Sequence, residues 1–171
     1  LPAGWEYITS TSQGRMRTQT GVSNSGSKAM ILDATVNGAS PDPQNELILT
    51  YDLSAYTVAD SLELEFESIQ SGEETHSGDG VWIRGNNTAP WIEILFVWNS
   101  QANGQWTNHV YDIDAILGSN GQTFSSTFQV RFGQMDNFTY GSDGVGIDDV
   151  TLRVFPYGVN FVDANTSVCF N

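Results

Sequence analysis

Residues 128–154, FQVRFGQMDNFTYGSDGVGIDDVTLRV, contain two runs of alternating apolar residues on either side of a polar turn. The first run places Phe128, Val130 and Phe132 on one side, and the second runs from Ile147 to Val154. A period of two is typical of a strand with one buried face. The Asp, Asn and Gly residues between the runs favour a turn. This stretch therefore predicts two strands, and it sets the pattern for the rest of the chain.

The second of these runs is interrupted by two adjacent carboxylates, Asp148 and Asp149. Aspartate has a poor preference for strands. Because side chains alternate along a strand, one of the two should point to the apolar side. A buried carboxylate is costly unless it is hydrogen-bonded, paired or bound to a metal. The pair therefore predicts a structural cation. The alternative is that Asp148 caps a turn by accepting bonds from backbone N–H groups.

The remainder of the chain is a series of short runs that read as strands, separated by loops rich in Gly, Asn and Ser. Residues 45–53 and 61–68 alternate most clearly, and residues 91–98 are apolar on both faces apart from Glu93. About ten such runs and no convincing helix predict an all-β fold, a two-sheet antiparallel β-sandwich of the jelly-roll type. We expect one domain over residues 1–155. Residues 156–171 lose the pattern and are predicted to be a linker or the start of a next module.

The charge balance restricts the possible partners. The chain has 20 acidic and 6 basic residues, a net charge of −14. Such a chain has no basic cluster to neutralise phosphates, so nucleic acid and anionic membranes are not expected partners. No apolar run approaches the roughly 20 residues of a membrane helix. The single cysteine, Cys169, forms no intrachain disulfide, and the composition is typical of a secreted, extracellular bacterial protein. We expect a monomeric module within a longer multidomain chain.

Several segments resemble the MAM-like and concanavalin-like jelly rolls of secreted multidomain proteins. The matching segments are Gly4-Trp5, residues 28–33, 79–84 (DGVWIR), 130–134 (VRFGQ) and 143–150 (DGVGIDDV). The cysteine pairs of animal MAM domains are absent, which favours the bacterial branch, found in adhesins and as accessory domains of exported hydrolases. The resemblance implies a structural calcium ion, binding of glycans or proteins, and no catalytic activity of the domain itself.

Two sets of carboxylates are candidate calcium ligands, because calcium prefers several oxygen atoms from converging loops. The first set is Asp148 with Asp33 and Glu6, and Asp149 is the alternative to Asp148. In jelly rolls of this type the first strands lie beside the last strand, which would bring these residues together. The second set comes from an acidic loop and a neighbouring turn: Glu73, Glu74, Asp79 and Asp143. Its alternative interpretation is a solvated acidic loop.

Aromatic and cationic side chains are the candidates for binding a glycan, because sugar rings stack on flat aromatic faces. Trp82 and Arg84 lie on the face of their strand opposite Val81 and Ile83. The predicted ligand-binding set is Trp82, Arg84, Trp106, Trp98 and Tyr140. The alternative for each aromatic residue is core packing, and Trp5 and Trp91 are assigned to the core.

Catalysis is not indicated by the sequence. The chain has two histidines, His76 and His109, and no nucleophile-elbow motif. The sequence therefore predicts a noncatalytic carbohydrate-binding module of a secreted polysaccharide-degrading enzyme, stabilised by calcium. The alternative is a protein-binding or adhesion module of a secreted or cell-surface protein.

Overall fold

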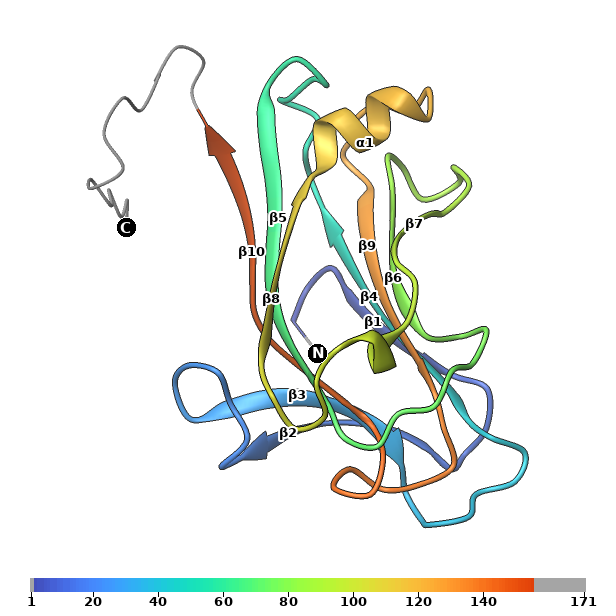
Figure 1. The fold of residues 1–171 in the computed structure, drawn as a ribbon. Coiled ribbons are helices and arrows are strands. Elements are labelled where there is room, and N and C mark those ends of the chain that lie inside the picture. Colours follow the sequence, from blue (N-terminus) through green and yellow to red (C-terminus); the bar gives the residue numbers. More distant parts are fainter. Residues whose placement is uncertain (1, 156–171) are drawn as a thin grey trace.

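A computed structural model of the chain describes residues 2–155, and these form two stacked five-stranded antiparallel sheets (Figure 1). Sheet A has the strand order β1-β4-β9-β6-β7, and sheet B has the order β2-β3-β10-β5-β8. The all-β jelly-roll sandwich predicted from the sequence is confirmed. The strands are β1 (Trp5–Thr9), β2 (Gly14–Thr20), β3 (Lys28–Ala34), β4 (Gln44–Tyr51), β5 (Ser61–Gln70), β6 (Gly80–Arg84), β7 (Ile92–Leu95), β8 (Thr107–Asp112), β9 (Phe128–Met135) and β10 (Val145–Phe155).

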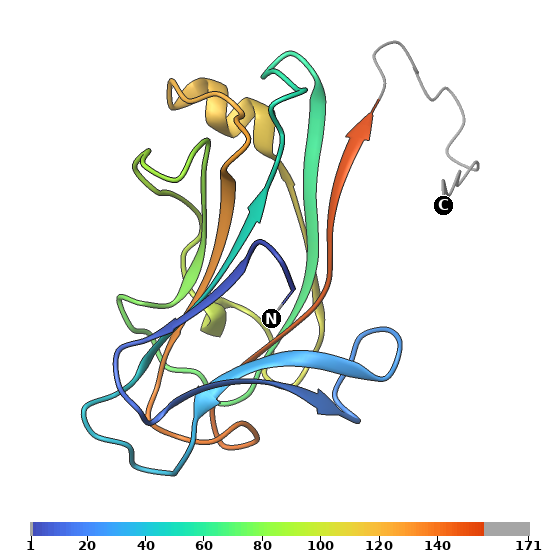
Figure 2. The same cartoon turned by 180° about the vertical axis from the view of Figure 1, so that it is seen from behind.

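Two short helices, which the sequence analysis did not predict, join the strands: η1 (Trp98–Ser100) and α1 (Ile113–Ser119). The Asp112 side chain caps α1 by accepting a bond from the Ala115 N–H at 2.9 Å. Ile113 and Leu117 lie four residues apart and are both buried, so one face of the helix closes an end of the sandwich (Figure 2). Within residues 2–155 no helix is long and apolar enough to span a membrane. Residues 156–171 lie outside the described part, so the domain boundary at 155 stays a prediction.

The core forms between the sheets from the side chains that alternate inward. Leu47, Leu49 and Phe132 of sheet A and Leu64 and Phe66 of sheet B are at most 1% exposed. The rings of Phe66 and Phe132 meet edge to face across the interface, with their centres 5.1 Å apart. Burial of these apolar surfaces is the main force that holds the two sheets together.

The double aspartate lies at a β-bulge in β10, where the register with β5 shifts between Asp148 and Thr151. Asp149 has φ = 51°, in the left-handed region that Asp tolerates better than most residues. The bulge adds a residue, so neither carboxylate points into the interior: Asp148 lies opposite Glu67 and Asp149 is exposed. The expectation that one of them points inward was wrong.

The two carboxylates instead hold the turn between β2 and β3. Asp148 Oδ2 accepts bonds from the backbone N–H groups of Asn24 at 2.9 Å and Ser25 at 3.2 Å. The Asp149 carboxylate accepts bonds from the side chains of the same two residues. The alternative interpretation, a carboxylate that caps a turn, is therefore the arrangement observed.

A buried ion pair fixes β2, β3 and the turn before β10. Asp33 in β3 is fully buried, and its two oxygens lie 2.8 Å from Arg15 Nε and 2.6 Å from Arg15 Nη2. Arg17 Nη2 lies 3.0 Å from Oδ2, and the backbone N–H of Tyr140 donates to the same oxygen at 2.8 Å. The carboxylate is thus neutralised and bonded on both oxygens, as a buried charge requires.

Replacing Asp33 with Asn removes the charge that two partly buried guanidinium groups need. Breaking a buried pair on one side costs about 3–5 kcal/mol, which corresponds to a melting temperature lower by roughly 6–20 °C at this chain length. Glu6→Gln, which removes the same charge at an exposed site, is the control and should change the melting temperature little. Differential scanning calorimetry of both variants tests this, and equal stability of Asp33→Asn and wild type would contradict it.

Candidate functional site

Three buried carboxylates converge where the segments after β5 and β9 approach the start of β10. Glu73 follows β5, Asp136 follows β9, and Asp143 lies two residues before β10. One oxygen from each lies within 4.8 Å of the others, and the residues are 6%, 1% and 3% exposed. Among residues 2–155, this is the one group of three or more acidic, histidine or cysteine side chains with that spacing.

The hydrogen bonds of this acidic cluster (Glu73, Asp136, Asp143) leave oxygens unsatisfied. Glu73 Oε1 accepts a bond from Gln134 Nε2 at 3.2 Å, and Asp143 Oδ1 accepts one from the Gly144 N–H at 3.0 Å. Asp136 Oδ1 is bonded to backbone N–H groups. Glu73 Oε2 and Asp136 Oδ2 are buried without a partner in the described chain. In the same region no basic side chain forms an ion pair with the cluster.

Burial raises the pKa values of all three carboxyl groups of the cluster. Burial, followed by the nearby charges of Asp79, Asp143 and Asp136, raises the pKa of Glu73 well above its usual value. Burial also raises the pKa of Asp136. Burial and the contact with Asp136 raise the pKa of Asp143 to about 7. Crowded carboxylates with unpartnered oxygens match the ligand preference of a hard divalent cation.

The second predicted metal set contained two members of this cluster. Glu73 and Asp143 belong to it, whereas Glu74 is exposed. Asp79 is buried but bonded to the backbone N–H groups of His76 at 2.7 Å and Met135 at 2.8 Å, so it shapes the loop. Asp136 was missed. Its position directly after a strand, in a turn with Asn and Gly, was the available signal.

The structure does not bring the first predicted metal set, Glu6, Asp33, Asp148 and Asp149, together as a ligand group. β3 and β10 do pair, as expected, but β1 belongs to the other sheet and carries Glu6 on an exposed position. Asp33 is already neutralised by two arginines. These residues do not meet because β1, which carries Glu6, lies in the other sheet from β3 and β10.

A second polar feature lies on the outer face of sheet A, and we call it the arginine–tryptophan surface: Trp82, Arg84, Trp91, Gln129 and Arg131. In β6 and β9 these positions alternate with fully buried residues such as Ile83 and Val130. The guanidinium carbon of Arg84 lies 4.1 Å from the centre of the Trp91 ring, and that of Arg131 lies 4.7 Å from it. Arg131 also lies 4.1 Å from the Trp82 ring centre. These are cation–π distances.

Hydrogen bonds order this surface across three strands. Gln129 Oε1 accepts bonds from Nε of Arg84 at 2.7 Å and from its Nη2. Gln129 Nε2 donates to Thr50 Oγ1 at 2.9 Å. Arg131 Nη1 forms an ion pair with Glu46 at 3.2 Å. Together the contacts form a polar and aromatic surface held in one arrangement.

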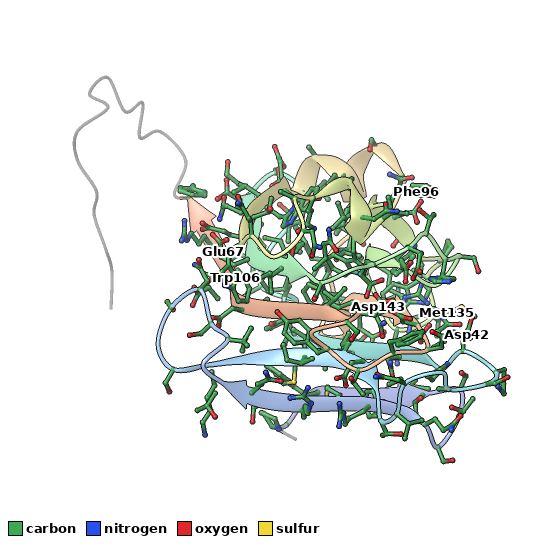
Figure 3. All side chains as sticks on the ribbon, turned by 60° about the horizontal axis from the view of Figure 1, so that its bottom comes forward. Asp42, Glu67, Phe96, Trp106, Met135 and Asp143 are labelled. Atoms are coloured by element: carbon green, nitrogen blue, oxygen red, sulfur yellow. The ribbon has the colours of Figure 1, made fainter. Side chains whose placement is uncertain are left out.

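The five predicted ligand-binding residues do not share one surface. Trp82 and Arg84 lie on sheet A, and Trp82 is only 9% exposed because its ring packs on Gly133. Trp106 directly precedes β8 and lies near Gly146 of β10, in sheet B, on the side away from Met135 of β9 (Figure 3). Tyr140 lies in the turn before β10, and its backbone N–H donates to Asp33 of sheet B.

Trp98 was nominated as a ligand-binding residue, but it is a core residue. It is fully buried, and its Nε1 donates to the Gly133 carbonyl oxygen at 2.7 Å. That prediction was wrong, because a completely buried ring offers no face to a ligand. Conversely, Trp91 was assigned to the core but is only partly buried, against two guanidinium groups. The outward alternation of Gln129 and Arg131 was a signal that the sequence analysis did not use.

No family model matches the chain, and no curated protein matches it. Solved structures with a similar fold include a carbohydrate-binding module of the β-sandwich superfamily with promiscuous specificity, at 12% identity and a TM-score of 0.55. The match covers 90% of this chain and 58% of that one, so this chain spans little more than half its length.

Two further structures match over nearly their whole length. One is the family 30 carbohydrate-binding module of a cellulosomal cellulase of Clostridium thermocellum, at 14% identity and a TM-score of 0.53, covering 88% of this chain and 91% of that module. The other is the K2 cleaved adhesin domain of Lys-gingipain, at 15% identity and a TM-score of 0.51, covering 91% of both chains. At these identities the similarity establishes the fold: the chain has the β-sandwich architecture found in carbohydrate-binding modules.

Proposed function

We propose that the chain is a noncatalytic carbohydrate-binding module of a secreted bacterial polysaccharide-degrading enzyme, stabilised by calcium, which binds glycan on the arginine–tryptophan surface. The observation that carries the proposal is the partly exposed Trp91 ring held against two guanidinium groups. A sugar would stack on the part of this ring that the guanidinium groups leave open. Arg84 beside it, and Glu46, which pairs with Arg131, would supply donors and acceptors for hydroxyl groups. Aromatic side chains with a few placed polar groups beside them are typical of the lining of ligand sites.

The histidine environment supports a noncatalytic role. His109 Nε2 lies 2.9 Å from Ser68 Oγ, a contact that resembles a nucleophile and its base. However, Ser68 is fully buried, and the His109 ring stacks on Phe66 with centres 4.7 Å apart. A serine without access to solvent cannot attack a substrate, so this contact is best explained as part of the core.

The acidic cluster fits a calcium ion. Glu73, Asp136 and Asp143 would supply carboxylate oxygens, including the two that lack a partner, and the Gln134 amide lies beside Glu73. A bound divalent ion would supply the positive charge that the cluster does not receive from any arginine, lysine or histidine of the described chain. It would then tie the segments after β5 and β9 to the start of β10.

Calcium should raise the melting temperature of the protein. At a concentration one hundred times Kd the stabilisation is about 2.7 kcal/mol, or roughly 5–10 °C at this chain length. Glu73→Gln should lose this response, and in EDTA at neutral pH it should melt above wild type, because the neutral amide does not need the proton that a buried Glu73 takes up on folding. Thermal melts with calcium and with EDTA test both statements. Glu6→Gln and Asp149→Asn are the controls and should keep the full response; its loss in either would favour the first predicted ligand set.

Without calcium, stability should fall as the pH rises. The folded-state pKa values of Glu73, Asp136 and Asp143 lie above their unfolded values. The folded protein therefore binds protons more tightly, and the stability is present at acidic pH and lost as the pH rises through about 7. Urea unfolding in EDTA should give a lower free energy of unfolding at pH 8 than at pH 5.5. Calcium should reverse the trend, because its ligands must be deprotonated. An equal free energy of unfolding at pH 5.5 and pH 8 in EDTA would contradict the burial of the three carboxyl groups together.

Glycan binding should depend on Trp91. We expect Trp91→Ala to weaken retardation in affinity gels containing plant and marine polysaccharides at least tenfold, because truncating an anchoring aromatic side chain typically costs more than 1.4 kcal/mol. Trp106→Ala, on the side of sheet B, should bind as wild type. Weaker binding by Trp106→Ala together with unchanged binding by Trp91→Ala would place the binding site on sheet B instead. Binding to none of the polysaccharides would reject the proposal and favour the alternative, a protein-binding or adhesion module.

A further inference from the structure

The arrangement of positive charge on sheet A gives information about the kind of glycan. The whole chain has six basic residues against 20 acidic ones. Arg15 and Arg17 pair with Asp33, Arg131 pairs with Glu46, and Arg153 pairs with Glu65. Lys28 is exposed at the start of β3. Arg84 is therefore the one arginine that forms no ion pair with another residue of the described chain.

Arg84 is nevertheless held in place. Two of its nitrogens donate to the neutral amide oxygen of Gln129, and its guanidinium group stacks on Trp91. Gln129 is itself fixed by its bond to Thr50. These contacts orient the guanidinium group without neutralising it. Burial lowers the pKa of Arg84, and no carboxylate contributes to counter that shift, whereas at Arg131 the charges of Glu46 and Glu93 do.

An oriented arginine that keeps its charge is the usual means of binding a planar or tetrahedral anion, because its donors match two oxygens at once. In a chain with a net charge of −14, an unpaired arginine has many acidic residues that could have neutralised it. The protein instead places a neutral glutamine beside it and an aromatic ring against it. A sugar bound at this surface would therefore lie next to a guanidinium group that no carboxylate neutralises.

We propose that the arginine–tryptophan surface recognises an anionic sugar, carrying a carboxylate or a sulfate ester, and that Arg84 binds the anionic group. This rests on the proposed glycan-binding function and names its ligand class. Because the rest of the chain repels polyanions at long range, the recognition depends on this local contact.

Calorimetric titration with matched pairs of short oligosaccharides tests the inference. Oligogalacturonate is compared with its methyl ester, and a sulfated galactan oligosaccharide with its desulfated form. We expect at least tenfold tighter binding of the anionic member of one pair, and the pair that responds identifies carboxylate or sulfate as the group. Arg84→Gln should abolish that preference. Arg153→Gln removes the same charge on sheet B and should keep it. Thermal melts of both variants establish that they are folded. Arg84→Lys keeps the positive charge but removes the paired N–H donors of the guanidinium group, and so separates the two contributions.

The outcomes separate the two proposals. Binding of neutral oligosaccharides alone, or an equal preference in Arg84→Gln and wild type, would overturn the anionic ligand while the carbohydrate-binding function stands. Binding of no oligosaccharide in either pair and of no polysaccharide in the affinity gels would overturn both.

Discussion

Buried carboxylates need a positive charge or a full set of hydrogen bonds, and this constraint governs how the turns of the sandwich are held. Asp33 satisfies it with Arg15, Arg17 and the Tyr140 N–H. Glu73, Asp136 and Asp143 do not satisfy it with any basic residue of the described chain. Both clusters join the segment before β10 to earlier parts of the chain. One of them is complete within the protein, and the other has carboxylate oxygens that could hold a cation.

The two faces of the sandwich carry different chemistry as a result of this arrangement. Sheet B uses Arg15, Arg17 and Arg153 in ion pairs with carboxylates of the same sheet. In sheet A, Arg131 pairs with Glu46, but Arg84 bonds to a neutral amide, and both guanidinium groups stack on Trp91. An ion pair within a sheet neutralises a charge, whereas a cation–π contact orients it and leaves it available. This difference is why we place the ligand on sheet A. The carboxylates near β10 serve to hold the turns.

The acidic cluster and the arginine–tryptophan surface are joined by β6 and β9. Asp79 directly precedes β6 and bonds to the backbone of Met135, the last residue of β9, and Asp136 follows it. Trp82 and Arg131 lie opposite each other within the same two strands. The strands that present the aromatic surface thus end at the carboxylates. Holding these ends together stabilises the strands without contributing a group to the ligand surface.

The sequence by itself determined the fold class, because a period of two in hydrophobicity reports which face of a strand is buried wherever the strand lies. Alternation identified residues 61–68 and 128–132 as strands, and the order of the runs indicated the jelly roll. It also placed Trp82 and Arg84 on the face opposite Val81 and Ile83, which the structure bears out. It also identified Glu73 and Asp143 as candidate metal ligands, but only as members of an acidic loop and a neighbouring turn.

Only the tertiary structure decided which carboxylates meet. Glu6 and Asp33 lie on strands that separate into different sheets, and the bulge at Asp148 turns both aspartates outward. Asp136 joins Glu73 across 63 positions of sequence because two segments beyond strand ends converge. The same holds for Trp91, which is apolar in the sequence but packs on guanidinium groups from β6 and β9. Local patterns record burial, whereas pairing between distant segments depends on strand order, and no short stretch of sequence encodes that order.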